Sequence, residues 1–169
     1  MALELLIARH AKSSWSNSSL SDHDRPLNKR GLRDAPRMAA WLSEQKLVPD
    51  IVLTSSANRA QTTAEIYCEQ WSDTAIQPQV IESFYLAHPT TYLEEAAQLG
   101  AEFERLMVVG HNPGLEGLVE ILTGEDEIMP TAAVAHVRFA ADNWSEVGTT
   151  AAKAELVGVF RPKEVLNLE

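Results

Sequence analysis

Short apolar runs recur along the chain, and each of them stops at polar residues. They cover residues 5–7, 51–53 and 106–109. Runs of this length are too short for a helix core and are typical of central strands in a parallel sheet, where both faces are buried. The stretches between the runs repeat apolar residues at helical spacing. We therefore predict alternating strands and helices, which is the pattern of an α/β fold.

The first predicted helix follows a polar loop and contains a proline. Asn28 is a natural cap, and the helix extends to about Gln45. Pro36 removes a backbone hydrogen bond in mid-helix, so we expect either a bend there or a fresh start capped by Asp34. The predicted buried stripe consists of Leu32, Ala35, Ala39 and Leu42, with Met38 and Trp41 beside it.

The remaining elements follow from the same kind of spacing. Helices are predicted over about 57–71 with Ser56 as cap, over about 91–99, and over about 113–122 with Asn112 as cap. Residues 78–81 suggest a short edge strand, and residues 134–139 and 155–161 suggest an antiparallel pair near the C-terminus.

Cationic side chains stand where the three central strands lead into loops or helices. Arg9 and His10 follow the first apolar run, and His111 follows the third. Arg59 falls in the first turn of the helix after the second run. Because the carboxyl ends of parallel strands meet at one edge of a sheet, we expect these side chains to converge. Arginine forks and helix N-termini favour phosphate or another oxyanion, so we predict a phosphoryl pocket with His10 as the nucleophile.

Four sequence blocks in this order resemble a known family. Residues 9–13 (RHAKS), 53–65 (LTSSANRAQTTAE) and 110–113 (GHNP) are similar to motifs of the histidine phosphatase superfamily. Residues 24–31 (DRPLNKRG), together with the short length, resemble the SixA-type phosphohistidine phosphatases. The resemblance spans residues 1 to about 162. One departure is Ala11, because the family usually has glycine after the Arg-His pair.

The resemblance implies both a fold and a reaction. The fold is a three-layer α/β/α sandwich, similar to phosphoglycerate mutase, with a mostly parallel sheet and an antiparallel C-terminal strand pair. The reaction is hydrolysis of phosphohistidine on a protein through phospho-His10, with no metal or other cofactor. Arg9, Arg59 and His111 hold the phosphoryl group, with His111 as imidazolium. The other ring N–H of His10 needs an acceptor, often a backbone carbonyl, so that its free nitrogen faces the substrate.

Further side chains are expected near the phosphoryl group. The loop over residues 11–28 brings Lys12, Ser13, Asn17 and Arg25 close enough in sequence to bind phosphate or substrate. Glu82 is the candidate proton donor for a leaving group, although it matches no clear acid motif. A phosphohistidine leaving group relaxes the need for an acid, because imidazole has a pKa of about 6.5. A phosphate-ester phosphatase of the same superfamily and a non-catalytic phosphate-binding module remain alternatives.

Composition and net charge indicate the class of protein and exclude some classes of binding partner. The chain has 169 residues, 45% hydrophobic and 22% charged, which predicts a single globular domain over 1–169. Its net charge is −10, and residues 60–169 hold five basic against eighteen acidic residues, which argues against nucleic-acid binding. No apolar run approaches the roughly 20 residues that span a bilayer.

With one cysteine and no evident signal peptide, we expect a cytoplasmic protein. The expected partner is a phosphorylated protein, such as a histidine-phosphotransfer domain, or a small phosphorylated substrate.

Overall fold

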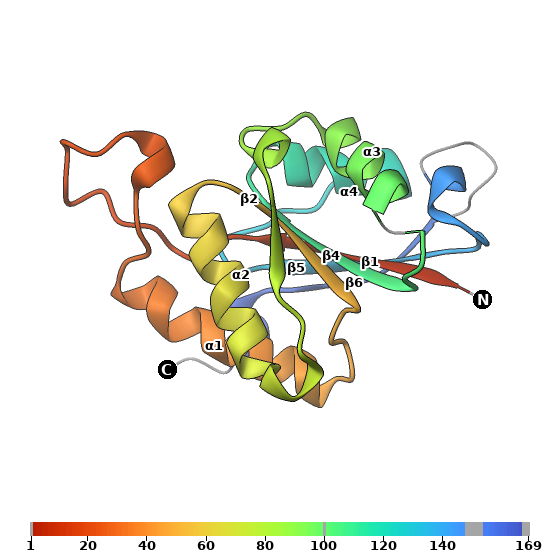
Figure 1. The fold of residues 1–169 in the computed structure, drawn as a ribbon, viewed down its shortest axis with the longest axis horizontal. Helices are drawn as coiled ribbons and strands as arrows, with labels where there is room; N and C mark the ends of the chain where they lie inside the picture. Colours follow the sequence, from red (N-terminus) through yellow and green to blue (C-terminus); the bar gives the residue numbers. More distant parts are fainter. Residues whose placement is uncertain (1, 100, 148–153, 167–169) are drawn as a thin grey trace.

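A six-stranded mixed sheet forms the middle layer of the computed structural model, which describes residues 2–99, 101–147 and 154–166 (Figure 1). The strand order is β3-β2-β4-β1-β5-β6. The strands are β1 (Leu3–Arg9), β2 (Ile51–Ser55), β3 (Pro78–Ile81), β4 (Arg105–Gly110), β5 (Val134–Phe139) and β6 (Ala154–Phe160). Strands β1 to β4 run parallel, whereas β5 is antiparallel to both β1 and β6. The predicted edge strand and the predicted antiparallel pair are both confirmed.

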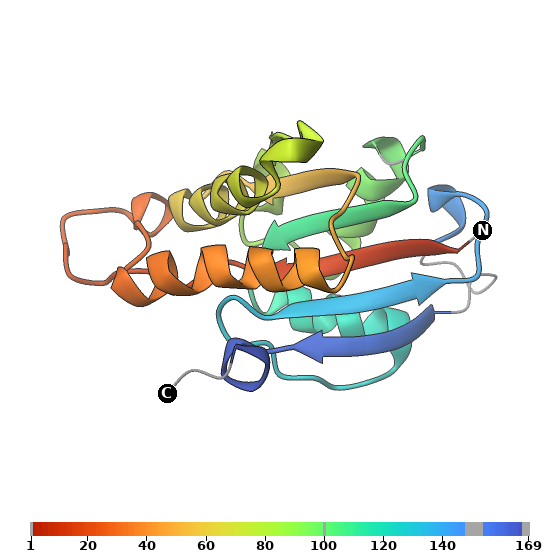
Figure 2. The same cartoon turned by 90° about the horizontal axis from the view of Figure 1, so that it is seen from below.

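Helices cover both faces of this sheet, so the predicted three-layer sandwich is confirmed (Figure 2). The helices are α1 (Lys29–Glu44), α2 (Asn58–Gln70), α3 (Pro89–Leu99), α4 (Gly114–Thr123) and α5 (Pro162–Val165). Short 3-10 turns occur at η1 (Asp22–Asp24), η2 (Ser72–Thr74), η3 (Glu82–Phe84) and η4 (Trp144–Glu146). In the part of the chain described, none of these helices has the length and apolar character needed to cross a membrane.

Alternation along the central strand β1 divides the interior into two cores. Leu5 and Ile7 face the core that contains α3 and α4. Leu6 and Ala8 face the core that contains α1 and α2. Because both faces of β1 are covered, the strand reads as a continuous apolar run rather than an alternating one. Burial on both faces also explains why β1, β2 and β4 were recognisable as continuous apolar runs in the sequence.

Helix α1 confirms the predicted cap at Asn28, excludes one of the two alternatives at Pro36, and corrects the predicted stripe at Leu32. The helix continues through Pro36, which excludes the alternative of a fresh start at Asp34; Asn28 caps the helix by accepting the N–H of Gly31 at 2.9 Å. Leu32 is 53% exposed and does not belong to the buried stripe. The stripe begins at Gly31 instead, because the backbone of Lys12 packs directly against that position.

The predicted caps of α2 and α4 were also wrong. Helix α2 has Ala57 at its N-cap, whereas the Ser56 hydroxyl lies 2.9 Å from Nε2 of His23. Helix α4 has Pro113 at its N-cap, and the Asn112 amide donates to the carbonyl oxygen of Met129 at 2.9 Å. Both side chains therefore make tertiary contacts, which local sequence does not reveal.

Candidate active site

The ends of β1 and β4 place two histidines side by side. These strands are parallel neighbours, and Arg9 is in register with Gly110. The next residue on each strand is a histidine, and the ring centroids of His10 and His111 are 5.2 Å apart. Arg59 arrives from the first turn of α2, which follows the neighbouring strand β2. The predicted convergence of Arg9, His10, Arg59 and His111 is therefore seen at one edge of the sheet.

These residues surround a small cavity of about 170 Å³. Its lining comes from six separate stretches of the chain and is mostly basic or polar. The lining residues are Arg9, His10, Lys12, Ser13, Trp15, Arg25, Arg59, Leu86, His111, Asn112 and Thr131. A larger hollow of about 680 Å³ lies at the opposite ends of the strands, but Asp50, Glu102 and Glu104 line it. That negative charge repels phosphate, so the basic cavity is the better anion site.

His10 is held as a neutral ring with one nitrogen available. Its side chain is buried, and Nδ1 lies 2.8 Å from the carbonyl oxygen of Ala11. The carbonyl can only accept, so Nδ1 donates and Nε2 keeps its lone pair. Burial lowers the pKa of His10 to about 3; the charges of His111, Arg59 and Arg9 act in the same direction, against the Ala11 carbonyl. The expected backbone acceptor is thus present.

With no anion in the cavity, His111 is a neutral ring; the imidazolium expected from the sequence concerns the site with a phosphoryl group bound and stays a prediction. Burial lowers its pKa to about 4, and the nearby charge of Arg59 adds to this. Its Nε2 lies 2.8 Å from the Ser55 hydroxyl oxygen, which also accepts the N–H of Ala57 at 3.2 Å. Nδ1 is buried and has no hydrogen-bond partner among the described residues. A neutral ring whose Nε2 accepts the Ser55 hydroxyl carries its proton on Nδ1, and that N–H is unused.

Arg9 and Asn112 share one backbone acceptor. Arg9 donates to the carbonyl oxygen of Met129 at 3.1 Å, and the Asn112 amide donates to the same oxygen at 2.9 Å. The Nε of Arg9 is buried without a partner in the described part of the chain. An arginine N–H left in this state is an available donor for an anion in the cavity.

The loop residues predicted to bind phosphate divide into two groups. Lys12, Ser13 and Arg25 line the cavity. The Arg25 guanidinium donates to the Ser13 hydroxyl, donates to the Ser14 carbonyl at 3.1 Å, and lies 3.3 Å from the centre of the Trp15 ring. Asn17 does not line the cavity, because the loop turns outward there and its Oδ1 accepts the hydroxyl of Ser19 at 2.6 Å.

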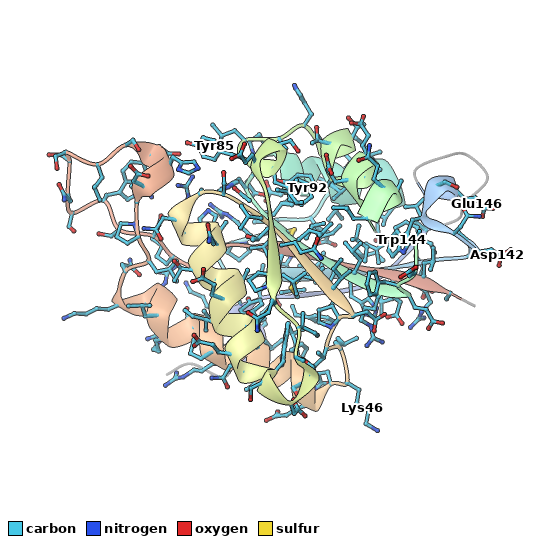
Figure 3. The ribbon with its side chains drawn as sticks, in the orientation of Figure 1. Lys46, Tyr85, Tyr92, Asp142, Trp144 and Glu146 are labelled. Carbon is cyan, nitrogen blue, oxygen red and sulfur yellow. The ribbon has the colours of Figure 1, made fainter. Side chains whose placement is uncertain are left out.

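Glu82, the predicted proton donor, is also outside the cavity lining. It is exposed in η3, one turn before the segment that reaches the site. Tyr85, one residue after η3, points toward η1 (Figure 3) and donates its hydroxyl to the Asp22 carboxylate. Leu86 is the residue of this segment that lines the cavity. Sequence spacing could not distinguish these positions, because the turn of η3 decides where each side chain points.

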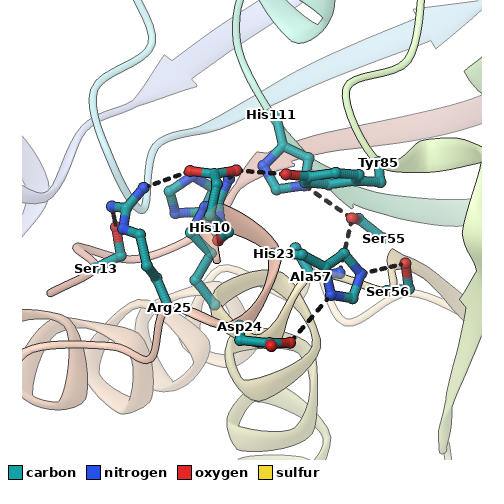
Figure 4. A network of polar contacts seen from close by, with 12 residues as sticks. His10, Ser13, His23, Asp24, Arg25, Ser55, Ser56, Ala57, Tyr85 and His111 are labelled. Atoms are coloured by element: carbon teal, nitrogen blue, oxygen red, sulfur yellow. Dashed lines mark hydrogen bonds and ion pairs between the residues drawn. The ribbon is translucent and has the colours of Figure 1, made fainter. Parts of the chain in front are cut away.

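Asp22 is the main feature that the sequence prediction missed. Its Oδ1 accepts a hydrogen bond from Arg25 at 2.7 Å, and its Oδ2 accepts from Arg59 at 3.0 Å and from the Tyr85 hydroxyl at 2.5 Å. Figure 4 shows two of these donors, Arg25 and Tyr85, approaching from opposite sides. The backbone carbonyl of Asp22 accepts a further bond from Arg59 at 2.6 Å. The Tyr85 hydroxyl and the two guanidiniums hold the pKa of this carboxyl well below its usual range. Asp22 is therefore ionised and forms ion pairs with Arg25 and Arg59.

Comparisons with known proteins agree with this geometry. The model of the histidine phosphatase superfamily (branch 1) matches residues 5–113. An uncharacterized protein of Mycobacterium tuberculosis is 34% identical over 168 residues, which is 92% of this chain and 99% of that protein. A crystal structure from Agrobacterium tumefaciens, assigned as the phosphohistidine phosphatase SixA, has a TM-score of 0.79 at 28% identity, covering 95% of this chain and 98% of that one.

A second solved structure supports the fold. The protein histidine phosphatase SixA complexed with tungstate has a TM-score of 0.73 at 24% identity, and the match covers 96% of this chain and 99% of that one. These structural matches agree with the mixed sheet and its two helical layers. The chain belongs to branch 1 of the histidine phosphatase superfamily, and it is of the SixA type.

Proposed function

We propose that this protein hydrolyses phosphohistidine on a protein surface through a phospho-His10 intermediate, without a metal ion. The observation that carries the proposal is the state of His10: a neutral ring, with Nδ1 engaged by the Ala11 carbonyl and Nε2 unprotonated. A neutral imidazole with a free nitrogen is a competent nucleophile toward phosphorus. The surrounding guanidiniums supply fixed positive charge for the phosphoryl oxygens.

The reaction divides into two displacements. The Nε2 lone pair of His10 attacks phosphorus, and the P–N bond to the substrate imidazole breaks. If the other nitrogen of that imidazole carries a proton, it leaves as a neutral ring. Water then attacks the phosphorus of phospho-His10, the P–Nε2 bond breaks, and the products are inorganic phosphate and neutral His10. Arg9, Arg59 and the Nδ1–H of His111 bind the phosphoryl oxygens in both steps.

The composition of the cavity wall favours a good leaving group. No carboxyl group is present among its described lining residues. Asp22, which touches the arginines, is held ionised and so lacks a proton to give. An alkoxide leaving group wants a general acid, whereas an imidazole with an ordinary pKa of about 6.5 leaves without one. These features support cleavage of a P–N bond over cleavage of a phosphate ester.

The size and rim of the cavity favour a substrate carried on a protein. About 170 Å³ is below the roughly 300–1,000 Å³ of pockets that enclose whole small ligands. Trp15 and Leu86 line its mouth and are 72% and 63% exposed. Exposed apolar side chains beside a polar site are typical of a contact surface for another protein. A phosphorylated side chain would enter the cavity while its own protein stays outside.

A trapping experiment tests the proposal. The protein is mixed with a protein that carries ³²P-phosphohistidine, quenched in alkali within the first turnover, and mapped by peptide sequencing. We expect label on His10 and none on the His10→Asn variant. An equal label on that variant, or hydrolysis at the wild-type rate, would reject His10 as the nucleophile.

A substrate panel tests the preference for phosphohistidine, and a chelator tests the independence from metal ions. We expect turnover of phosphohistidine to exceed that of alkyl phosphate esters by at least a hundredfold, and EDTA to leave the rate unchanged. Comparable turnover of both substrate classes would favour the ester phosphatase. Tight phosphate binding without any turnover would favour a non-catalytic binding module.

A further inference from the structure

Asp22 occupies donors that the proposed reaction needs. Both terminal nitrogens of Arg59 bond to this one residue, NH1 to its carbonyl oxygen at 2.6 Å and NH2 to its carboxylate at 3.0 Å. Arg25, from the same loop, bonds to the other carboxylate oxygen at 2.7 Å. Carboxylate and phosphate are equivalent partners for a guanidinium, since both accept its paired N–H donors. An incoming anion therefore meets arginines that already hold an internal anion.

The charge of Asp22 acts in the same direction as its hydrogen bonds. The carboxylate is ionised, and it faces the cavity residues Arg25, Arg59 and, at longer range, His111. Like charges a few ångströms apart repel, and because the Asp22 side chain is 43% exposed, water screens part of this repulsion. A dianion that approaches Arg59 must therefore overcome this repulsion or displace the carboxylate from the arginines.

We propose that Asp22 is a specificity-determining residue that competes with free anions for Arg25 and Arg59, so that the site binds inorganic phosphate weakly. The carboxylate holds the arginines when the cavity is empty, yields them to a phosphoryl group delivered by its carrier, and takes them back as phosphate leaves. The inference rests on the proposed role of Arg59 in holding the phosphoryl group. It does not depend on which phosphorylated substrate is hydrolysed.

The position of Asp22 is fixed by contacts that its carboxylate does not make. The segment η1 docks on the N-terminus of α2 through His23, whose Nε2 lies 2.9 Å from the Ser56 hydroxyl oxygen. The Asn58 amide adds a hydrogen bond to the carbonyl oxygen of Asp24 at 3.1 Å. The His23 ring also packs edge-on against Tyr85, with centroids 4.8 Å apart. Neutralising the Asp22 carboxylate therefore leaves η1 anchored.

The chain provides a matched control two residues away. Asp24 lies in the same turn and its side chain is exposed; among the residues that the structure describes, its carboxylate contacts the Nδ1 of His23, at 3.5 Å. Asp24→Asn changes the net charge of the protein as much as Asp22→Asn does. The pair of variants thus separates the local contact with the arginines from the overall charge.

Equilibrium binding of orthophosphate and of tungstate, measured by calorimetry at pH 7, tests the proposal without any turnover. We expect Asp22→Asn to lower the Kd of both anions about tenfold, and Asp24→Asn to leave both within twofold of wild type. If Asp22 serves only to orient the arginines, its loss weakens anion binding. A Kd for Asp22→Asn that rises, or that falls less than threefold, would overturn the proposal.

A kinetic measurement provides the second readout, on folded protein confirmed by circular dichroism. Product inhibition by phosphate should tighten about tenfold in Asp22→Asn and in Asp22→Ser, because both remove the competing charge. If neither variant shows tighter inhibition, Asp22 does not compete with the product. If the proposed phosphohistidine activity itself fails, the anion-binding result still stands, so the two failures are distinguishable.

Discussion

The hydroxyl oxygen of Ser55 lies 2.8 Å from Nε2 of His111, and this contact decides which nitrogen of the ring carries the proton. Ser55 is buried, and its oxygen already accepts the N–H of Ala57. Its own hydrogen needs an acceptor, and a neutral Nε2 provides one. His111 therefore offers Nδ1–H to the cavity although it bears no charge. A neutral donor with a fixed tautomer is available over a wide range of pH.

Without the Ser55 hydroxyl, the proton of His111 should no longer be confined to Nδ1. We expect Ser55→Ala to lower kcat about tenfold with little change in KM, because the donor to the phosphoryl group in flight is no longer held. Nitrogen-15 chemical shifts of His111 should move from a fixed Nδ1–H form to a mixture. Ser55→Thr keeps a hydroxyl and should restore the fixed form. Ser56→Ala, next along the chain, should leave the His111 shifts unchanged.

Arg59 is expected to contribute more than its charge. We expect Arg59→Ala to reduce kcat/KM by about 10²–10³, as is usual when one preorganised donor to the transition state is lost. Arg59→Lys keeps the charge but loses the paired donors, so most of the reduction should remain. Arg138→Ala serves as the control, since this arginine is half-exposed on β5 and pairs with Glu155 at 3.7 Å. A wild-type rate in Arg59→Lys would contradict the bidentate role.

The two buried histidines should not titrate in the range usual for histidine. Burial lowers the pKa of His10 to about 3 and that of His111 to about 4, whereas a histidine free in water titrates near about 6.5. We expect their Cε1–H signals to stay constant between pH 7.5 and 5.5 in the ligand-free protein. The same signals should titrate with a midpoint at about pH 6.5 in urea. A midpoint above pH 6 in the folded protein would show that the rings are charged in the site.

The same pKa shifts make the fold sensitive to acid. Below about pH 6.5 the unfolded chain binds protons at both histidines, and the folded protein does not until about pH 4 for His111 and about pH 3 for His10. The free energy of unfolding should therefore be greatest above pH 6.5 and fall as the pH drops toward 4. The slope is at most about 1.4 kcal/mol per pH unit for each histidine. Urea unfolding of His10→Asn should show a visibly shallower pH dependence.

Gly31 is where α1 meets the loop that follows His10. A Cβ at this position would lie 2.2 Å from the carbonyl oxygen of Lys12, which is backbone and cannot swing away. We expect Gly31→Ala to destabilise the fold by about 1–3 kcal/mol in urea unfolding, because backbone must shift. Leu32→Ala, at the next and half-exposed position, should change stability by less than about 0.5 kcal/mol. Equal stabilities of the two variants would mean that the close approach does not constrain the fold.

The sequence predicted the four central residues because they stand at strand ends and helix starts. His10 and His111 follow adjacent parallel strands, so their meeting depends only on strand order and register. Asp22 was not predictable in this way. Its hydrogen-bond donors lie 3, 37 and 63 residues further along the chain, and they meet only after the loop folds over α2. The caps at Ser56 and Asn112 failed for the same reason, since tertiary contacts outweighed local preference.

The carbonyl oxygen of Met129, in the C-terminal third of the chain, helps to position residues of the proposed phosphoryl site. It lies beyond the region matched by the family model, yet it accepts hydrogen bonds from both Arg9 and Asn112. The carbonyl of His10 itself accepts the N–H of Ala132 at 2.9 Å. A polypeptide that stopped after α4 would possess every residue of the proposed phosphoryl cage and still lack the scaffold that aims them. Sequence motifs alone therefore do not delimit the smallest working unit of this fold.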